Sequence, residues 1–127
     1  MSNPTLNFIK MRKTFRYKNL SFAVADETDV NFTVEFMSDG NTGQTLINIP
    51  GPNDPEIQDA GSTLIGKGIQ LRGDTTICFS DIANLNPNED EIRIQYKING
   101  QLLKEHINMK TDEKTPIIIL FINFPKP

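Results

Sequence analysis

The side chains that most often build catalytic and metal sites are scarce in this sequence. Its 127 residues include one cysteine, Cys78, one histidine, His106, and no tryptophan. A single cysteine excludes an internal disulfide, and one thiol with one imidazole is too few for an ordinary zinc site. No recognisable constellation surrounds either residue, and we interpret Cys78 as a buried small hydrophobe and His106 as a half-exposed strand residue. We therefore expect no catalytic residue, no cofactor and no metal, and a protein that is not an enzyme.

Long apolar segments are also missing. The longest largely apolar run, "PIIILFINF", stops at nine residues, whereas a membrane-spanning helix needs about 20. The first 13 residues carry polar groups throughout, so we expect no signal peptide. These observations predict a cytoplasmic protein that makes no membrane contact.

The recurring hydrophobic period is two, and no segment shows a helical stripe. In "VNFTVEFM", Val30, Phe32 and Val34 alternate with polar residues, as in a half-buried strand. Similar patterns predict eight or nine strands, at residues 5–13, 15–25, 30–37, 44–49, 62–73, 75–83, 91–98, 101–109 and 115–124. We predict one all-β domain spanning residues 1–127, an antiparallel β-sandwich that is Ig-like in the broad sense, with a closed β-barrel as the alternative. The absence of a Cys–Trp–Cys framework excludes a true immunoglobulin domain.

Local signals mark several corners of this fold. Asn99-Gly100, between two alternating runs, predicts a hairpin, because both residues tolerate the positive φ of a type I′ turn. Asn19 marks a bulge, and Gly73-Asp74 predicts a turn between two paired strands. The Asn-Gly corner is the strongest of these signals.

Charge is distributed unevenly along the chain. Residues 1–25 hold five basic side chains and no acid, so the net charge of −3 leaves −8 for the remainder, with acidic loops at 51–61 and 86–91. Phe8, Phe15 and Tyr17 lie among the basic residues, a mixture that single-strand nucleic-acid binders use. The pI near 5.1 argues against a polyanionic partner. We expect no nucleic-acid partner and assign the basic arm to a protein partner or a solvated face.

The acidic loop at residues 86–91 superficially resembles a calcium loop. Asn86, Asn88 and Asp90 have the spacing that begins an EF-hand, but Glu91 stands where glycine is needed and Lys97 where the bidentate glutamate is needed. A sandwich-type site, with Glu89 and Asp90 joined by Asp54 or Asp59, stays open as an alternative. We interpret these residues as solvated turns.

The final strand is apolar on both faces, which is typical of a strand in the middle of a sandwich or under an interface. We predict a non-catalytic protein–protein interaction or assembly protein that presents loops and edge strands, either as a structural component or as an inhibitor of the immunity type. A small-ligand module for carbohydrate or calcium is the alternative. The candidate protein-binding residues lie in the basic arm and the final strand: Lys10, Arg12, Lys13, Arg16, Ile118, Leu120, Ile122 and Phe124.

The expected partners include further copies of the chain. The opposite charges of the basic arm and the acidic loops favour head-to-tail pairing of such copies. A competing hypothesis is that the amino-terminal arm of the same chain covers the final strand.

Overall fold

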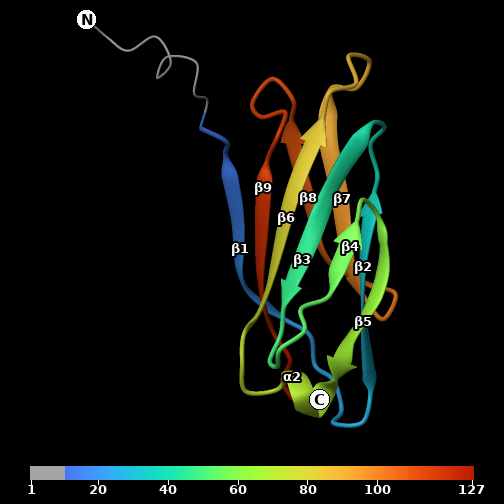
Figure 1. Cartoon of the computed structure of the whole chain (residues 1–127), viewed down its shortest axis with the longest axis vertical. Helices are drawn as coiled ribbons and strands as arrows, with labels where there is room; N and C mark the ends of the chain where they lie inside the picture. Colours follow the sequence, from blue (N-terminus) through green and yellow to red (C-terminus); the bar gives the residue numbers. More distant parts are fainter. Residues whose placement is uncertain (1–10) are drawn as a thin grey trace, which may run out of the picture.

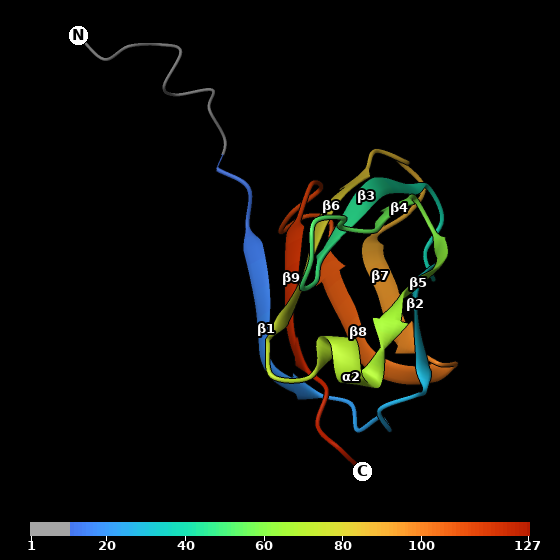
Figure 2. The ribbon, with the colours of Figure 1, turned by 60° about the horizontal axis from the view of Figure 1, so that its bottom comes forward.

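The computed structural model describes residues 11–127, which form two stacked β-sheets (Figures 1 and 2). The elements in chain order are β1 (Thr14–Ser21), β2 (Asp29–Phe36), β3 (Asn41–Asn48), β4 (Glu56–Gln58), β5 (Gly61–Lys67), the helical turn α2 (Gly68–Leu71), β6 (Thr76–Asn84), β7 (Glu91–Ile98), β8 (Gln101–Met109) and β9 (Ile117–Asn123). The strand order is β1-β9-β6-β3-β4 in the five-stranded sheet and β5-β2-β7-β8 in the four-stranded sheet. The predicted β-sandwich is confirmed, and residues 11–127 do not form a closed barrel.

The strands form where apolar and polar residues alternate, because this alternation lets one side of each strand be buried between the sheets. Val30, Phe32 and Val34 of β2 are at most 1% exposed and face the core. The matching positions of β7 are Ile92, Ile94, Tyr96 and Ile98, all fully buried. The hairpin from β7 to β8 turns at Asn99 and Gly100, both with positive φ, so the type I′ signal is confirmed.

The first and last strands lie side by side in parallel, while every other strand pairing is antiparallel (Figure 1). Thr14 pairs with Ile117 and Arg16 with Ile119, and the register shifts between Tyr17 and Leu20. Asn19 lies in that shift with φ of 63°, so the predicted bulge is confirmed. Because β1 pairs with one edge of β9 and β6 with the other, the apolar final strand lies in the interior of its sheet.

The segment between β5 and β6 corrects the sequence-based prediction. Residues 62–73 were expected to form one strand paired with the next, but the strand ends at Lys67, and β5 and β6 belong to different sheets. Gly68 approaches the connection before β2 so closely that a Cβ there would lie 2.2 Å from the carbonyl oxygen of Ala25. The chain turns there through one helical turn, which buries Leu71 under the sandwich.

The structure also differs from the sequence-based prediction in the loop at residues 51–61 and in the strand expected at residues 5–13. The loop at residues 51–61 contains a short strand, β4, which alternation over three residues is too brief to indicate. Of the strand expected at 5–13, residues 5–10 lie outside the described residues, and residues 11–13 precede β1 without being a strand.

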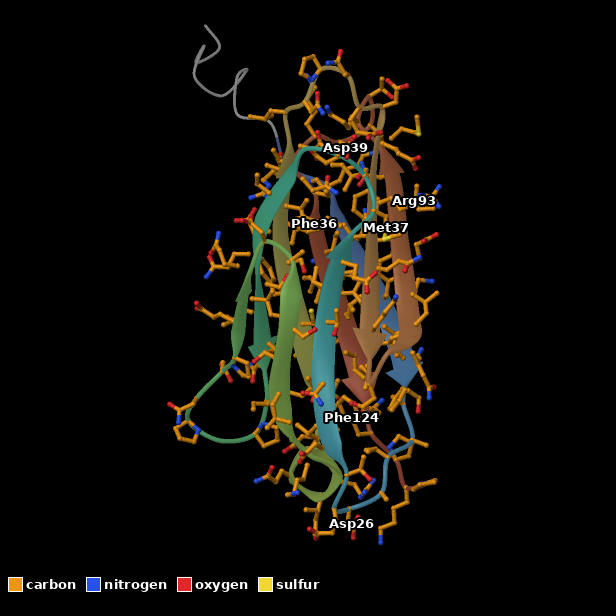
Figure 3. All side chains as sticks on the ribbon, turned by 90° about the vertical axis from the view of Figure 1, so that its right-hand side faces the viewer. Asp26, Phe36, Met37, Asp39, Arg93 and Phe124 are labelled. Atoms are coloured by element: carbon orange, nitrogen blue, oxygen red, sulfur yellow. The ribbon has the colours of Figure 1, made fainter. Side chains whose placement is uncertain are left out.

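The lower end of the sandwich is closed by Arg72. Its guanidinium donates to the carbonyl oxygens of Phe124 (2.8 Å) and Val24 (2.9 Å) and pairs with Asp26 (2.6 Å). Figure 3 shows Asp26 at this end of the molecule and Asp39 at the opposite end. One side chain thus ties the connection before β2 to the residues that follow β9.

Candidate interaction surface

The outer faces of the two sheets differ in chemistry. The four-stranded sheet presents charged side chains: Arg93 pairs with Glu91 (3.4 Å) and Glu105 (3.5 Å), and Lys97 pairs with Glu35 (3.1 Å). Figure 3 shows Arg93 projecting away from the core. The exposed apolar residues of this sheet stand at its two edges, Leu64 on β5 and Leu102, Ile107 and Met109 on β8, with the charged strands between them.

The five-stranded sheet has an apolar outer face. β9 is apolar on both sides, and β6 carries Ile77 and Phe79 at positions that alternate with its buried residues, so these side chains point outward. We define the outer patch as the apolar residues on this face: Leu46 on β3, Ile77 and Phe79 on β6, and Ile117, Ile119 and Phe121 on β9. Leu46 and Phe79 are 38% and 40% exposed, and the four others are partly buried. A contiguous patch of this kind is typical of an interaction surface.

One transverse row of this face runs across all five strands. Leu46 pairs with Glu56 on one side and Phe79 on the other, and Ile119 continues the row from Phe79 to Arg16. Pairing across a sheet keeps side chains on the same face, so the row presents an apolar centre with one charge at each end. We call it the central row: Glu56, Leu46, Phe79, Ile119 and Arg16.

The face is hollowed beside this row. A shallow depression of about 280 Å³ is lined by Gln44, Leu46, Glu56, Phe79 and Asp81. Asp81 pairs with Arg12, whose Nε also donates to the carbonyl oxygen of Thr115 at 2.7 Å. The carboxylate at the border of the patch is therefore neutralised within the chain.

Sheet edges are protected against the addition of another strand. Arg16 and Lys18 project from β1, which also carries the bulge at Asn19, and β4 has only three residues. In the four-stranded sheet, the register shifts at both edge strands, opposite Val30 and Asn31 for β5 and opposite Tyr96 and Lys97 for β8. Charges, bulges and short strands are the usual devices that block edge-to-edge pairing. Within residues 11–127, the outer patch is thus better suited to binding than the edges.

The structure separates the residues predicted from the basic arm. Lys10 lies outside the described residues, Arg12 pairs with Asp81, and Lys13 pairs with Asp112. Arg16 is exposed and forms one end of the central row. Of the predicted basic residues that are described, Arg16 therefore has the best position for contacting a partner.

The four residues predicted on the final strand lie in the core. Ile118, Leu120, Ile122 and Phe124 are at most 2% exposed, so in the folded chain they contact the opposite sheet and are not accessible to a partner. The outward residues of β9 are the ones that alternate with them. The sequence signal for this outer side was the double-sided apolar pattern of β9, but periodicity gives no means of telling which side faces inward.

His106 is fully buried, which corrects the expected half-exposed position. Its Nδ1 lies 2.7 Å from Tyr17 Oη, and its Nε2 lies 2.7 Å from Asn108 Oδ1. Phe15 packs edge-on against the imidazole at 4.7 Å between ring centroids. The aromatic side chains of β1 cover the imidazole, an arrangement that sequence alternation within β8 does not reveal. Both ring nitrogens have partners within the protein.

Cys78 is buried, as predicted, and its surroundings suppress thiol chemistry. Burial raises the pKa of the thiol far above its ordinary value, and a hydrogen bond with Ser80 lowers it by less. A reactive cysteine is instead partly exposed and has a lowered pKa. The geometry around Cys78 does not provide an activated nucleophile.

The acidic loops do not gather into a metal centre in the part of the chain that the structure describes. Residues 11–127 contain no group of three or more His, Cys, Asp or Glu side chains able to hold an ion. Glu89 instead accepts hydrogen bonds from the backbone amides of Asp39, Asp90 and Glu91, and these bonds lower its pKa. Its carboxylate orders the loop.

A second depression, of about 450 Å³, opens between the loops at the upper end. It is lined by Leu85, Pro87, Glu89, Asp90, Met109, Lys110, Thr111 and Lys114. Lys110 donates to the carbonyl oxygen of Asn86, and Glu89 is held by backbone amides. Because these two charged groups are used within the chain, the depression is a weaker candidate than the outer patch.

Comparison with known proteins gives no match to a family model, a curated protein or a solved structure. Within residues 11–127, no helix combines the length and the apolar character that a membrane crossing requires. The fold and the outer patch together define the class of this molecule as a β-sandwich with one outer face apolar at its centre and the other charged at its centre.

Proposed function

We propose that this chain is a non-catalytic binding protein that holds a protein partner against the outer patch, as an assembly component or as an inhibitor of the immunity type. The observation that carries the proposal is the contrast between the two outer faces. Charged pairs occupy the centre of one sheet, while six apolar side chains follow one another across the centre of the other. An interface has this anatomy, with an apolar centre depleted of charge and a polar rim.

Burial of the patch gives the expected driving force. Leu46 and Phe79 retain the largest exposed fractions within it, so a partner would remove most additional apolar surface there. Complete burial of a fully exposed side chain of this kind contributes roughly 1.5–3 kcal/mol, and burial of the part of Leu46 and Phe79 that is still exposed contributes a fraction of that for each. A flat, central and well-supported aromatic residue also has the character of a binding hot spot.

The proposed location is the cytoplasm. The lone cysteine is consistent with a reducing compartment, where structural disulfides are rare.

Photo-crosslinking tests the proposal. A photoreactive phenylalanine analogue is placed at Phe79 and, in a matched control, at Leu64, an exposed leucine of β5 that is 54% exposed. In the native cell, we expect position 79 to crosslink one discrete protein and position 64 not to do so. The purified crosslinked protein should then bind the wild type and Leu64→Asp but lose affinity for Phe79→Asp.

Two results would contradict the proposal. One is the absence of a specific crosslink at position 79. The other is a partner whose affinity is unchanged by Phe79→Asp in a variant that keeps the wild-type melting temperature.

A further inference from the structure

We infer that the outer patch binds a second copy of this chain face to face, about a two-fold axis that runs along β6 through Phe79. This inference rests on the proposed function and names the partner. Its basis is the order of side chains in the central row, from Glu56 at one edge of the sheet to Arg16 at the other.

The central row is complementary to its own reverse. A two-fold axis along the strands turns the second sheet over and reverses the order of the strands across the interface. Glu56 then lies opposite the partner's Arg16, Leu46 opposite the partner's Ile119, and Phe79 opposite the partner's Phe79. The two apolar centres coincide, and each end of the row brings together opposite charges.

A two-fold axis across the strands gives a worse arrangement. Every strand would then face its own copy, and Arg16 would approach the partner's Arg16 while Glu56 approached the partner's Glu56. Juxtaposed like charges disfavour this orientation. The axis along the strands also agrees with the usual packing of two sheets, whose strand directions differ by about 30°.

The depression beside the central row fits the same geometry. It lies over β3, between β4 and β6, and Gln44 and Leu46 of β3 line it. Reversal of the strand order places β9 of the partner subunit opposite β3, so Ile117 and Ile119 of the partner subunit face the depression. Apolar side chains thus meet a hollow of about 280 Å³ that each copy offers to the other.

Within residues 11–127, Asp81 makes the like-charge contact near the axis. It neighbours Phe79 on β6 and would lie near the partner's Asp81. Each carboxylate is already paired with Arg12 of its own chain, which balances its charge. Repulsion between the two Asp81 carboxylates therefore does not oppose this arrangement of the two copies.

This arrangement differs from the head-to-tail pairing expected from the basic arm and the acidic loops. Arg12 and Lys13 are paired within the chain, with Asp81 and Asp112. The free energy of association would come from the apolar centre, and Arg16 with Glu56 would set the orientation. A closed dimer follows, because a two-fold contact uses the same patch on both copies.

Charge exchange tests this geometry on the full chain. Arg16→Glu and Glu56→Arg each place like charges at both ends of the central row, and we expect each to raise the dimer Kd about tenfold or more at low ionic strength. The double variant restores both pairs with their signs exchanged. An equimolar mixture of the two single variants also restores both pairs, so it should form a heterodimer with nearly wild-type affinity. Analytical ultracentrifugation measures each Kd, with Leu64→Asp as the unaffected control.

The outcomes separate the two proposals. Wild-type dimers that survive Phe79→Asp, or single variants whose mixture does not associate, would overturn the two-fold dimer. A monomeric wild type whose position 79 crosslinks a different protein also overturns the dimer, yet supports the proposed function. Absence of any specific crosslink at position 79 overturns both.

Discussion

Tyr17 and His106 connect the two edge strands that close one side of the sandwich, with 2.7 Å between Tyr17 Oη and His106 Nδ1. Asn108 fixes the tautomer, because its amide nitrogen donates to the carbonyl oxygens of Met109 and Glu113 and its Oδ1 must therefore accept from His106 Nε2. His106 Nδ1 is then left as an acceptor for the tyrosine hydroxyl. The imidazole is thus held neutral between β1 and β8.

Stability is expected to fall when the solution is acidified below pH 6.5. Burial lowers the pKa of His106 from its ordinary value of 6.5, and the hydrogen bond with Asn108 opposes part of this change. The unfolded chain binds a proton near pH 6.5, while the folded chain does so only at lower pH. The neutral imidazole of His106 makes its full contribution to the free energy of unfolding above pH 6.5. This contribution is lost between pH 6.5 and the lowered pKa of the folded state. Over that range the free energy of unfolding changes by at most about 1.4 kcal/mol per pH unit.

Urea unfolding at a series of pH values measures this slope. His106→Gln is the matched control, since it lacks the titrating ring and should show a flatter profile just below pH 6.5. The slopes are compared, because the substitution itself changes the overall stability. Identical slopes in both proteins would contradict the assignment to His106.

The Cys78 thiol should be inert in the folded protein. It is fully buried, and burial raises its pKa, so neither access nor thiolate formation favours reaction. We expect labelling by an aromatic disulfide reagent to be about a hundredfold slower, or more, in native buffer than in denaturant. Cys78→Ala gives the background signal. Rapid stoichiometric labelling of the native protein would show that the thiol is accessible.

Arg72→Lys should destabilise the lower end of the sandwich. The ammonium group cannot reproduce the planar fork that contacts Phe124, Val24 and Asp26 together. We expect a loss of about 1–3 kcal/mol in the free energy of unfolding, as for other buried hydrogen bonds to a charged group.

Arg93→Lys is the control for this prediction, because Arg93 makes exposed ion pairs on the charged outer face. Its expected effect is within about 0.5 kcal/mol. Denaturant titrations of the two variants measure the loss in the free energy of unfolding for each. Equal losses would mean that the contacts of Arg72 do not stabilise the fold more than a surface pair does.

Millimolar calcium should leave the melting temperature unchanged. The oxygens of Glu89 accept from backbone amides, and residues 11–127 show no cluster of three acidic or soft ligands. An ion that binds only the native state must raise the melting temperature. Calorimetry with calcium, and with magnesium as the control, checks the expectation. A saturable increase specific to calcium would revive the small-ligand alternative.

Much of the local structure was predictable from the sequence. Alternation in β2 and β7, the Asn99-Gly100 turn and the bulge at Asn19 all depend on neighbouring residues, so the chain encodes them within short windows. The helical turn at Gly68 was not predictable in this way. It arises where the backbone passes against Ala25, which is more than 40 residues earlier in the chain.

The candidate surface shows the same division. Sequence alone determined that β9 carries apolar side chains on both faces and that the amino-terminal arm is basic. Only the tertiary structure decided that Ile118, Leu120 and Ile122 face the core, while Ile117 and Ile119 face outward. The physical reason is that a period of two defines two faces without distinguishing them, and that burial of one face requires a second sheet. The central row likewise exists only because pairings distant in sequence align Glu56 and Arg16 across five strands.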